Sequence, residues 1–187
     1  MASAIDICST ALTLLGDKPI SSLTEDAPRA VVVANIYPTA RADVMRCHPW
    51  NCLENDVVLS PMAEAPPFRW SKQFQLPGDL LRVIEIGGGL QRNDYRLQGR
   101  KIKANTDVLY LTYIQDIDES LWDGNLVDLM IKRMVKDLAY PITASTSLAE
   151  LRAQEYKVAE RIAKAVDAQE NPPEDWEHES EFLVVRG

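Results

Sequence analysis

The spacing of apolar residues changes twice along this 187-residue chain, and those two changes restrict its fold more than any other feature. Up to residue 53, and again from residue 118, apolar residues recur every three or four positions, which predicts amphipathic helices. Between residues 54 and 117, short β-branched or alternating runs are separated by proline and glycine, which predicts strands joined by turns. Helices on either side of a run of strands favour an α+β fold over alternating α/β units.

The same pattern predicts the domain organisation. We expect a four-helix unit built from residues 1–53 and 118–171, with a small antiparallel β-sheet domain, residues 54–117, inserted between the second and third helices. Residues 172–187 follow the last helical stretch and are expected to form an extended C-terminal arm. This arm has too little apolar content to belong to the core, so we expect its removal to leave the fold intact.

Local signals predict where the helices begin and end. Ser3 and Asp123 are suited to cap the first and third helices. Pro141 is expected to stop the third helix, and Ser147 with Glu150 forms a plausible capping box for the fourth. The fourth helix is expected to bury an apolar stripe: Leu148, Leu151, Tyr156, Ala159, Ile162, Ala163 and Val166.

Charge is distributed unevenly. The chain has 20 basic and 28 acidic residues, a formal net charge of -8, which argues against wrapping by nucleic acid. Residues 170–187 hold six acidic residues and only Arg186 as a base, and they end in an apolar run. The candidate partner-binding residues of this arm are Trp176, Phe182, Leu183, Val184 and Val185. Acidic residues followed by apolar ones suit a segment that docks on another chain.

One basic patch opposes this trend. A hairpin is predicted around Gly99, and residues 92–103 contain five cations against Asp94 alone. On a hairpin these cations are a candidate contact for phosphate, or for an acidic neighbour such as the arm of another copy. A solvated strand face remains the simpler interpretation. The five cations are Arg92, Arg96, Arg100, Lys101 and Lys103.

No catalytic, metal or cofactor site is indicated. Cys47, His48 and Cys52 are close together, but a closed zinc site needs four ligands and no second Cys or His pair exists. The acids between Asp116 and Asp123 lack the glycine and glutamate of a calcium loop. The sequence contains no phosphate loop, dinucleotide fingerprint or nucleophile elbow. Three scattered cysteines and the lack of a signal peptide or a membrane-length apolar run favour a chain made in the cytoplasm.

Several segments, in their order and spacing, resemble those of one known family. The most specific is Arg46-Cys47-His48-Pro49-Trp50-Asn51 at the end of the long second helix. From the residues alone, His48 to Asn51 indicates a structural junction: Pro49 ends the helix and Trp50 anchors it to the sheet. The chain resembles the tail tubular protein A family of short-tailed bacteriophages, also called head-to-tail adaptors. The other segments are Ala11-Leu12 to Leu15-Gly16, Ile20-Ser21-Ser22-Leu23, Phe74-Gln75-Leu76-Pro77, Asp79–Val83, Gly99-Arg100 and Tyr113-Ile114.

The resemblance implies a structural virion protein and no enzyme. Members form a dodecameric ring below the portal protein, extend the DNA channel, and offer a platform for the tail nozzle, a tail tubular protein B-like protein. The implied partners are therefore further copies of itself, the portal, the nozzle and double-stranded DNA that passes without sequence-specific binding. The implied location is the virion, at the head-tail interface, with assembly in the host cytoplasm and no membrane contact.

Two alternatives stay open at this point. A head- or tail-completion protein of a long-tailed phage would share this architecture. A cytosolic enzyme with a carboxylate site would need two convergent acids with perturbed pKa values in one pocket.

Overall fold

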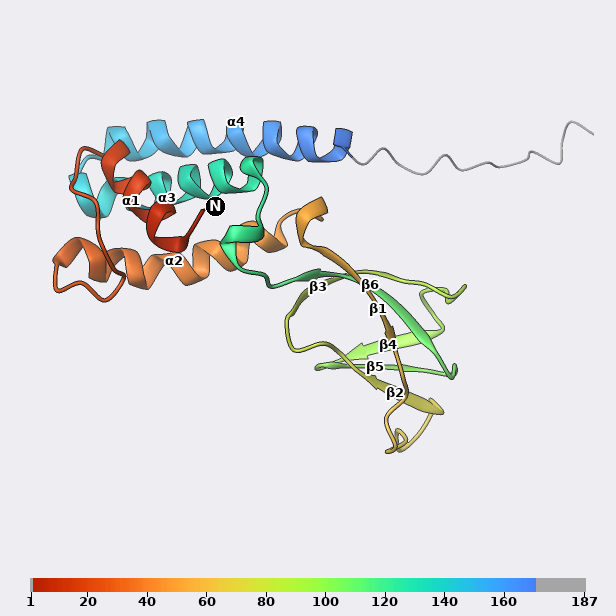
Figure 1. Ribbon diagram of the computed structural model, residues 1–187. Helices are drawn as coiled ribbons and strands as arrows, with labels where there is room; N and C mark the ends of the chain where they lie inside the picture. The colour runs from red at the N-terminus through yellow and green to blue at the C-terminus, as the bar shows by residue number, and fades with distance from the viewer. Residues whose placement is uncertain (1, 171–187) are drawn as a thin grey trace, which may run out of the picture.

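The computed structural model describes residues 2–170, and it confirms an α+β fold (Figure 1). The four helices lie together in one layer, and all six strands form a separate lobe beside them. The predicted arm, residues 172–187, lies outside the described residues. The helices are α1 Ala4–Leu14, α2 Pro28–Arg46, α3 Gly124–Thr143 and α4 Thr146–Glu170; the strands are β1 Glu54–Leu59, β2 Lys72–Gln75, β3 Leu80–Ile86, β4 Tyr95–Gln98, β5 Lys101–Ala104 and β6 Leu109–Gln115.

Two of the predicted helix caps are confirmed. The Ser3 hydroxyl accepts from the Asp6 amide at 3.2 Å, and the Asp6 carboxylate accepts from the Ser3 amide at 3.1 Å, a reciprocal capping box. The Asp123 carboxylate accepts from the Leu126 amide at 2.7 Å and so caps α3. These caps satisfy backbone N–H groups that have no partner within the helix.

The boundary between α3 and α4 was predicted wrongly. The helix α3 runs through Pro141 to Thr143 and ends at Ala144, which has a left-handed φ of 53°. Pro141 has no N–H to donate to the Asp137 carbonyl, so the last turn lacks one backbone hydrogen bond, but the helix continues past it for two residues. The capping oxygen of α4 is that of Ser145, which accepts from the Leu148 amide at 3.3 Å, whereas Ser147 is already inside the helix.

The helix α3 is the centre of the helical layer. Most of its apolar stripe is buried, with Val127 and Ile131 partly buried, and it packs against α1, α2 and α4. The stripe that the sequence predicted for α4 is only partly buried. Tyr156 and Ala163 face the core, but Leu151 and Ile162 are 48% and 56% exposed. Helical periodicity identified apolar positions of α4 correctly but did not reveal that they span two faces.

The strands form two sheets, where the sequence predicted one. One sheet has the order β1-β6-β3 and the other β2-β5-β4, with antiparallel pairing throughout. Phe74 and Ile102 from one sheet share a hydrophobic cluster with Leu109 and Leu111 from the other. Two short sheets that face each other bury more apolar surface than one flat sheet of six strands, which would leave a face exposed.

The β4–β5 hairpin predicted around Gly99 is confirmed. Its strands are joined by the two residues Gly99 and Arg100, and Gly99 has a φ of +59°, which glycine adopts without steric cost. The register places Arg96 opposite Lys103 and Leu97 opposite Ile102. Ile102 and Ala104 of the hairpin lie in the β cluster and Tyr95 packs against it, whereas Leu97 is 49% exposed. Arg96 and Lys103 lie on the opposite face of the two strands.

A second, larger hydrophobic cluster fills the helical layer and reaches into the lobe. It includes Trp50 and Leu53, from the segment that joins α2 to β1, and Ile114 of β6. Leu81 and Ile84 of β3 pack against it. The predicted domain boundaries, at residues 53 and 118, fall in these joining segments and stay a prediction.

Candidate functional site

The segment from His48 to Asn51 links α2 to β1, and Trp50 is its anchor. The indole is completely buried, and its N–H donates to the Val44 carbonyl at 2.9 Å. The His48 ring stands edge-on to the indole, with 4.8 Å between ring centroids and 71° between ring planes. This arrangement supplies a large apolar anchor whose one polar atom is satisfied.

The same segment holds the C-terminal end of α4 through Asp167. One carboxylate oxygen lies 3.0 Å from Nε2 of His48, and the other accepts from the Asn51 amide at 3.0 Å. The Asn51 side-chain amide donates to the Asp167 carbonyl at 2.7 Å. Asp167 is only 2% exposed, so these contacts replace the water that its carboxylate loses. We call these residues the α4 clamp.

The cysteines beside this segment have ordinary packing roles. Cys47 is exposed and Cys52 is half-buried. Within residues 2–170, no group of three or more His, Cys, Asp or Glu side chains is placed to hold a metal ion. Burial raises the pKa of the Cys52 thiol to about 12, so at neutral pH it is protonated.

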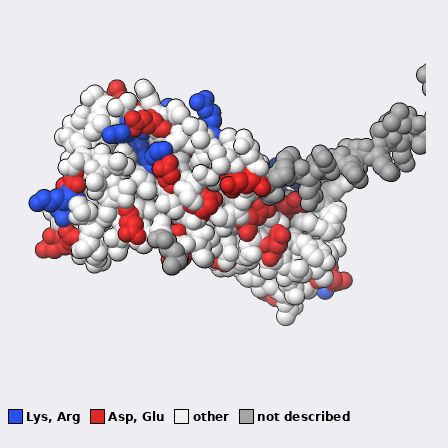
Figure 2. All heavy atoms as spheres, turned by 45° about the horizontal axis from the view of Figure 1, so that its top comes forward, with Lys and Arg blue, Asp and Glu red and all other residues white. Residues whose placement is uncertain are grey.

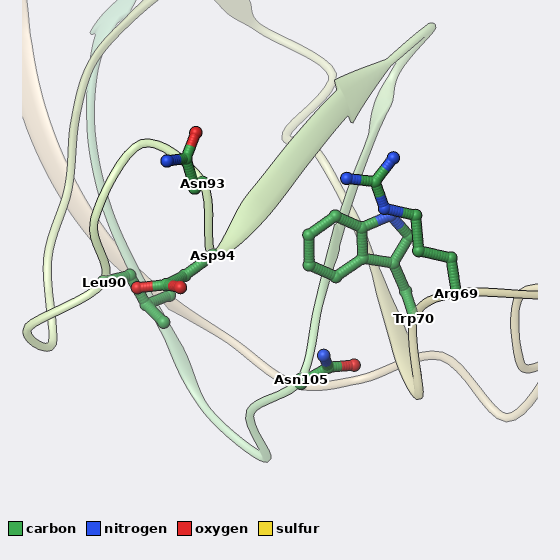
Figure 3. A pocket seen from close by; sticks show the side chains of 6 residues that line it. All are labelled: Arg69, Trp70, Leu90, Asn93, Asp94 and Asn105. Atoms are coloured by element: carbon green, nitrogen blue, oxygen red, sulfur yellow. The ribbon is translucent and has the colours of Figure 1, made fainter.

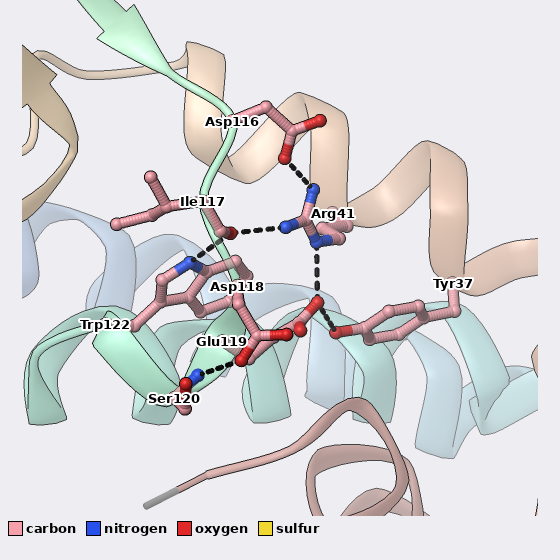
Figure 4. A network of polar contacts seen from close by, with 8 residues as sticks. All are labelled: Tyr37, Arg41, Asp116, Ile117, Asp118, Glu119, Ser120 and Trp122. Carbon is pink, nitrogen blue, oxygen red and sulfur yellow. Dashed lines mark hydrogen bonds and ion pairs between the residues drawn. The ribbon is translucent and has the colours of Figure 1, made fainter. Parts of the chain in front are cut away.

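A second polar cluster joins α2 to the segment between β6 and α3 (Figure 4). The Arg41 guanidinium donates to Glu119 at 2.6 Å, to Asp116 at 2.6 Å and to the Ile117 carbonyl at 2.6 Å. The Tyr37 hydroxyl donates to Glu119 at 2.8 Å. Burial, and then this bond to Glu119, raise the pKa of the Tyr37 hydroxyl. We call this set the Arg41 network.

The three aspartates that resemble the start of a calcium loop in sequence, Asp116, Asp118 and Asp123, have structural partners within the protein. Asp116 pairs with Arg41, the Asp118 side chain accepts from the Ser120 amide at 3.0 Å, and Asp123 caps α3. Each acid has a protein partner, and together they shape the junction rather than converge on one point. Sequence reasoning missed Glu119 and Asp167, the two buried acids of these clusters.

The five cations of the predicted basic patch are not equivalent. Arg100 donates to the carbonyls of Pro77 and Gly78 and thus secures a turn. Arg92 is exposed in the loop before β4, and Lys101 lies opposite Gln98. Arg96 and Lys103 are directly opposite each other across the two strands. This last pair lines a concavity.

That concavity lies between the β4–β5 hairpin and the loop before β2, and we call it the cation groove. It has a volume of about 370 Å³, and its lining includes Phe68, Arg69, Trp70, Arg96, Gln98 and Lys103. Arg69 is the central residue of a tight turn in which the Trp70 amide donates to the Phe68 carbonyl at 2.9 Å. Trp70 lies just before β2.

Trp70 also forms one wall of a second hollow (Figure 3). This hollow has a volume of about 360 Å³ and is lined on its far side by Leu90, Asn93 and Asp94. In Figure 3 the Arg69 guanidinium lies beside the indole, with its central carbon 5.4 Å from the ring centroid. The loop is held in place by the Asn105 side chain, which accepts from the Ser71 amide at 2.8 Å.

The exposed apolar side chains of α4 form a further candidate surface. Leu151, Val158 and Ile162 lie seven and four residues apart, which places them along one side of the helix. With the aliphatic part of Lys132 from α3, they line a shallow hollow of about 440 Å³. We call this surface the α4 face.

The predicted arm residues Trp176 and Phe182 to Val185 lie outside the described residues. Within residues 2–170, carboxylates predominate over the middle and right of the face seen in Figure 2. No helix in that range has the length and hydropathy needed to cross a bilayer. Comparisons with family models and with curated proteins found no match to this chain.

Proposed function

We propose that this protein is a structural virion protein, a head-to-tail adaptor that forms a ring below the portal of a tailed bacteriophage. The ring extends the DNA channel and provides the platform for the tail nozzle. The proposal starts from the resemblance of the His48–Asn51 segment and its flanking motifs to the tail tubular protein A family. It is an assembly function and involves no catalysis.

The single observation that carries the proposal is the α4 face. Soluble monomers rarely expose a contiguous row of large aliphatic side chains, because each costs free energy in water. Leu151, Val158 and Ile162 form such a row on a helix whose opposite side, with Tyr156 and Ala163, is packed in the core. A ring needs one such face on every subunit, met by a different face of the next.

Charge is consistent with this role. With 28 acidic residues against 20 basic ones the chain has no excess of cations to hold the phosphates of DNA, so a channel built from such subunits lets DNA slide. The separate β lobe is a second surface, available to a neighbouring layer of the tail while the helices pack within the ring. The α4 clamp supports this role by fixing the end of the helix that carries the interface.

Electron microscopy of the full chain mixed with its portal protein tests the proposal. We expect a monomer or loose oligomer alone and a ring on the portal after mixing. Absence of any ring or complex would refute it. A ring that forms instead on the connector of a long-tailed phage would assign the protein to head or tail completion.

Two substitutions of matched exposure test the α4 face. Ile162→Glu places a charge in the proposed interface and is expected to abolish ring formation while the monomer melts normally. Val31→Glu, on α2, is the control, since Val31 is also 56% exposed. Rings from the Ile162→Glu variant at the wild-type yield would exclude the α4 face as the interface.

Removal of residues 172–187 tests the arm separately. We expect the truncated chain to keep its cooperative thermal transition but to assemble poorly on the portal. Loss of the transition would show instead that these residues belong to the fold.

A further inference from the structure

We propose that the cation groove binds the acidic segment of this same chain, residues 174–182, supplied by the same or a neighbouring copy. This inference concerns the β lobe and does not depend on the adaptor function. It follows from three properties of the groove, namely its unpaired charge, its strained backbone and its exposed aromatic ring, together with the composition of the segment.

The groove concentrates positive charge without compensation. Arg69, Arg96 and Lys103 line it, and no acidic residue does. None of the three takes part in an ion pair within residues 2–170; the Lys103 ammonium donates only to the neutral Gln98 side chain, at 2.9 Å. Arg96 and Lys103 are directly opposite on antiparallel strands, an arrangement that destabilises a sheet when the charges are alike. An anion between them would remove that repulsion.

The turn that forms the other wall is strained. Arg69 has a φ of +70°, a left-handed conformation that side chains other than glycine rarely adopt. The bond from the Trp70 amide to the Phe68 carbonyl closes a three-residue turn around it, and the positive-φ form of this turn is rare. Such strain gathers where a protein positions groups for binding. In this turn the left-handed backbone at Arg69 places the guanidinium and the rings of Phe68 and Trp70 along the cation groove.

The Phe68 ring supplies an apolar contact. It is 78% exposed, the largest exposed fraction among the large apolar residues that the structure describes. The turn therefore offers an uncovered phenyl ring beside three cations. A ligand that satisfies both is an acidic peptide with an aromatic or aliphatic side chain next to its carboxylates.

The segment 174–182 has this composition. It reads Glu-Asp-Trp-Glu-His-Glu-Ser-Glu-Phe, with five carboxylates, no Lys or Arg, and an aromatic residue near each end. It begins seven residues after Asp167, whose position at the junction is fixed by the α4 clamp. An extended chain spans about 3.3 Å per residue, so the segment can reach well beyond the helix end. Every copy carries one groove and one such segment.

Nucleic acid is the less suitable occupant. Three cations neutralise few phosphates, and the net charge of the chain is -8, so DNA would be repelled by the rest of the molecule. An acidic segment attached to the chain meets the groove at a high effective concentration and needs fewer contacts. Binding of nucleic acid in the groove is nevertheless an outcome that the experiment distinguishes.

The test is carbodiimide cross-linking of the full chain, which joins a lysine amine to a carboxylate in contact with it, followed by peptide mass spectrometry. We expect a cross-link from Lys103 to an acid within 174–181. Lys132 and Asp128, whose side chains lie 2.7 Å apart, provide an internal standard for the reaction. A mixture of ¹⁵N-labelled and unlabelled protein shows whether the two residues belong to one copy or to two.

Matched variants decide whether the groove is responsible. Arg96→Gln and Phe68→Ser each leave Lys103 in place and should lower its cross-link about three-fold relative to the internal standard. Arg92→Gln removes an exposed arginine outside the groove and should leave the yield unchanged. No cross-link at Lys103, or one that none of the variants alters, would overturn the proposal. So would a duplex oligonucleotide that binds the protein and loses affinity in Arg96→Gln when no Lys103 cross-link forms.

Discussion

The junction between the two lobes and the cation groove use the same residue types in opposite ways. At the junction, Arg41 lies against Glu119 and Asp116, and Trp50 is enclosed. In the groove, Arg96 faces another cation and Trp70 is partly exposed. The difference lies in whether an acid or an apolar surface reaches the side chain from elsewhere in the fold. Polar groups that find such partners hold the molecule together, and those that find none remain available for binding.

The comparison predicts that Trp50 contributes far more to the free energy of unfolding than Trp70 does. This is the largest effect that we expect. Trp50→Ala should lower the free energy of unfolding by about 3–5 kcal/mol, because it leaves a cavity and an unpaired Val44 carbonyl. Trp70→Ala should cost about 1 kcal/mol or less, since part of the ring is already in water. Urea denaturation of both variants measures this. Equal losses would remove the distinction between junction and groove.

Disrupting the Arg41 network should cause the second largest loss in the free energy of unfolding. Glu119→Ala leaves the Tyr37 hydroxyl and part of the Arg41 guanidinium without their acceptor in a largely buried site, at a cost of about 2–3 kcal/mol. The control is Asp118→Ala, which removes an exposed acid next to it that only caps a short turn, and should lower the free energy of unfolding much less. Chemical denaturation compares the two, and similar losses would mean that the network adds little.

These sites differ in how far the sequence alone can predict them. The helices, the hairpin and the caps at Ser3 and Asp123 depend on neighbours within a few positions, so periodicity and local chemistry identified them. The His48–Asn51 segment was recognised as a junction. Its partner Asp167 was not, because 119 positions separate His48 from it, although an acid four residues after Ala163 on the buried stripe was a signal.

The predictions that failed share a physical reason. The sequence predicted one sheet and a single apolar stripe on α4, but periodicity reports only that a residue is apolar and not what covers it. Whether Ile162 is buried depends on α3 covering one side of α4 and leaving the other free. The groove was partly foreseen through Arg96 and Lys103. Phe68 and Arg69 were missed because a left-handed arginine has no signature in the sequence.

The α4 clamp should have a moderate effect. Asp167→Asn keeps the shape of the side chain, but its amide nitrogen cannot accept from His48 or from the Asn51 amide. One donor is then left unpaired, at a cost of about 1–2 kcal/mol. Asp128→Asn is the matched control on an exposed helix surface and should change stability by less than about 0.5 kcal/mol. Hydrogen exchange should also show faster opening of the last turns of α4 only in the Asp167 variant.

The smallest effect, and the only one expected to stabilise, concerns Arg69. Glycine adopts a φ of +70° without a steric penalty, so Arg69→Gly relieves about 1–2 kcal/mol of backbone strain and gives back part of it through the greater freedom of the unfolded chain. We therefore expect Arg69→Gly to raise the free energy of unfolding by about 0.5 kcal/mol. Arg92→Gly, at an exposed position without a positive φ, has no strain to relieve and should lose about 0.5 kcal/mol. Opposite shifts of the urea midpoint would show that the turn at Arg69 is strained and that the exposed loop at Arg92 is not. If both variants lose stability equally, the turn at Arg69 is unstrained and the groove loses one of the three properties that mark it as a binding surface.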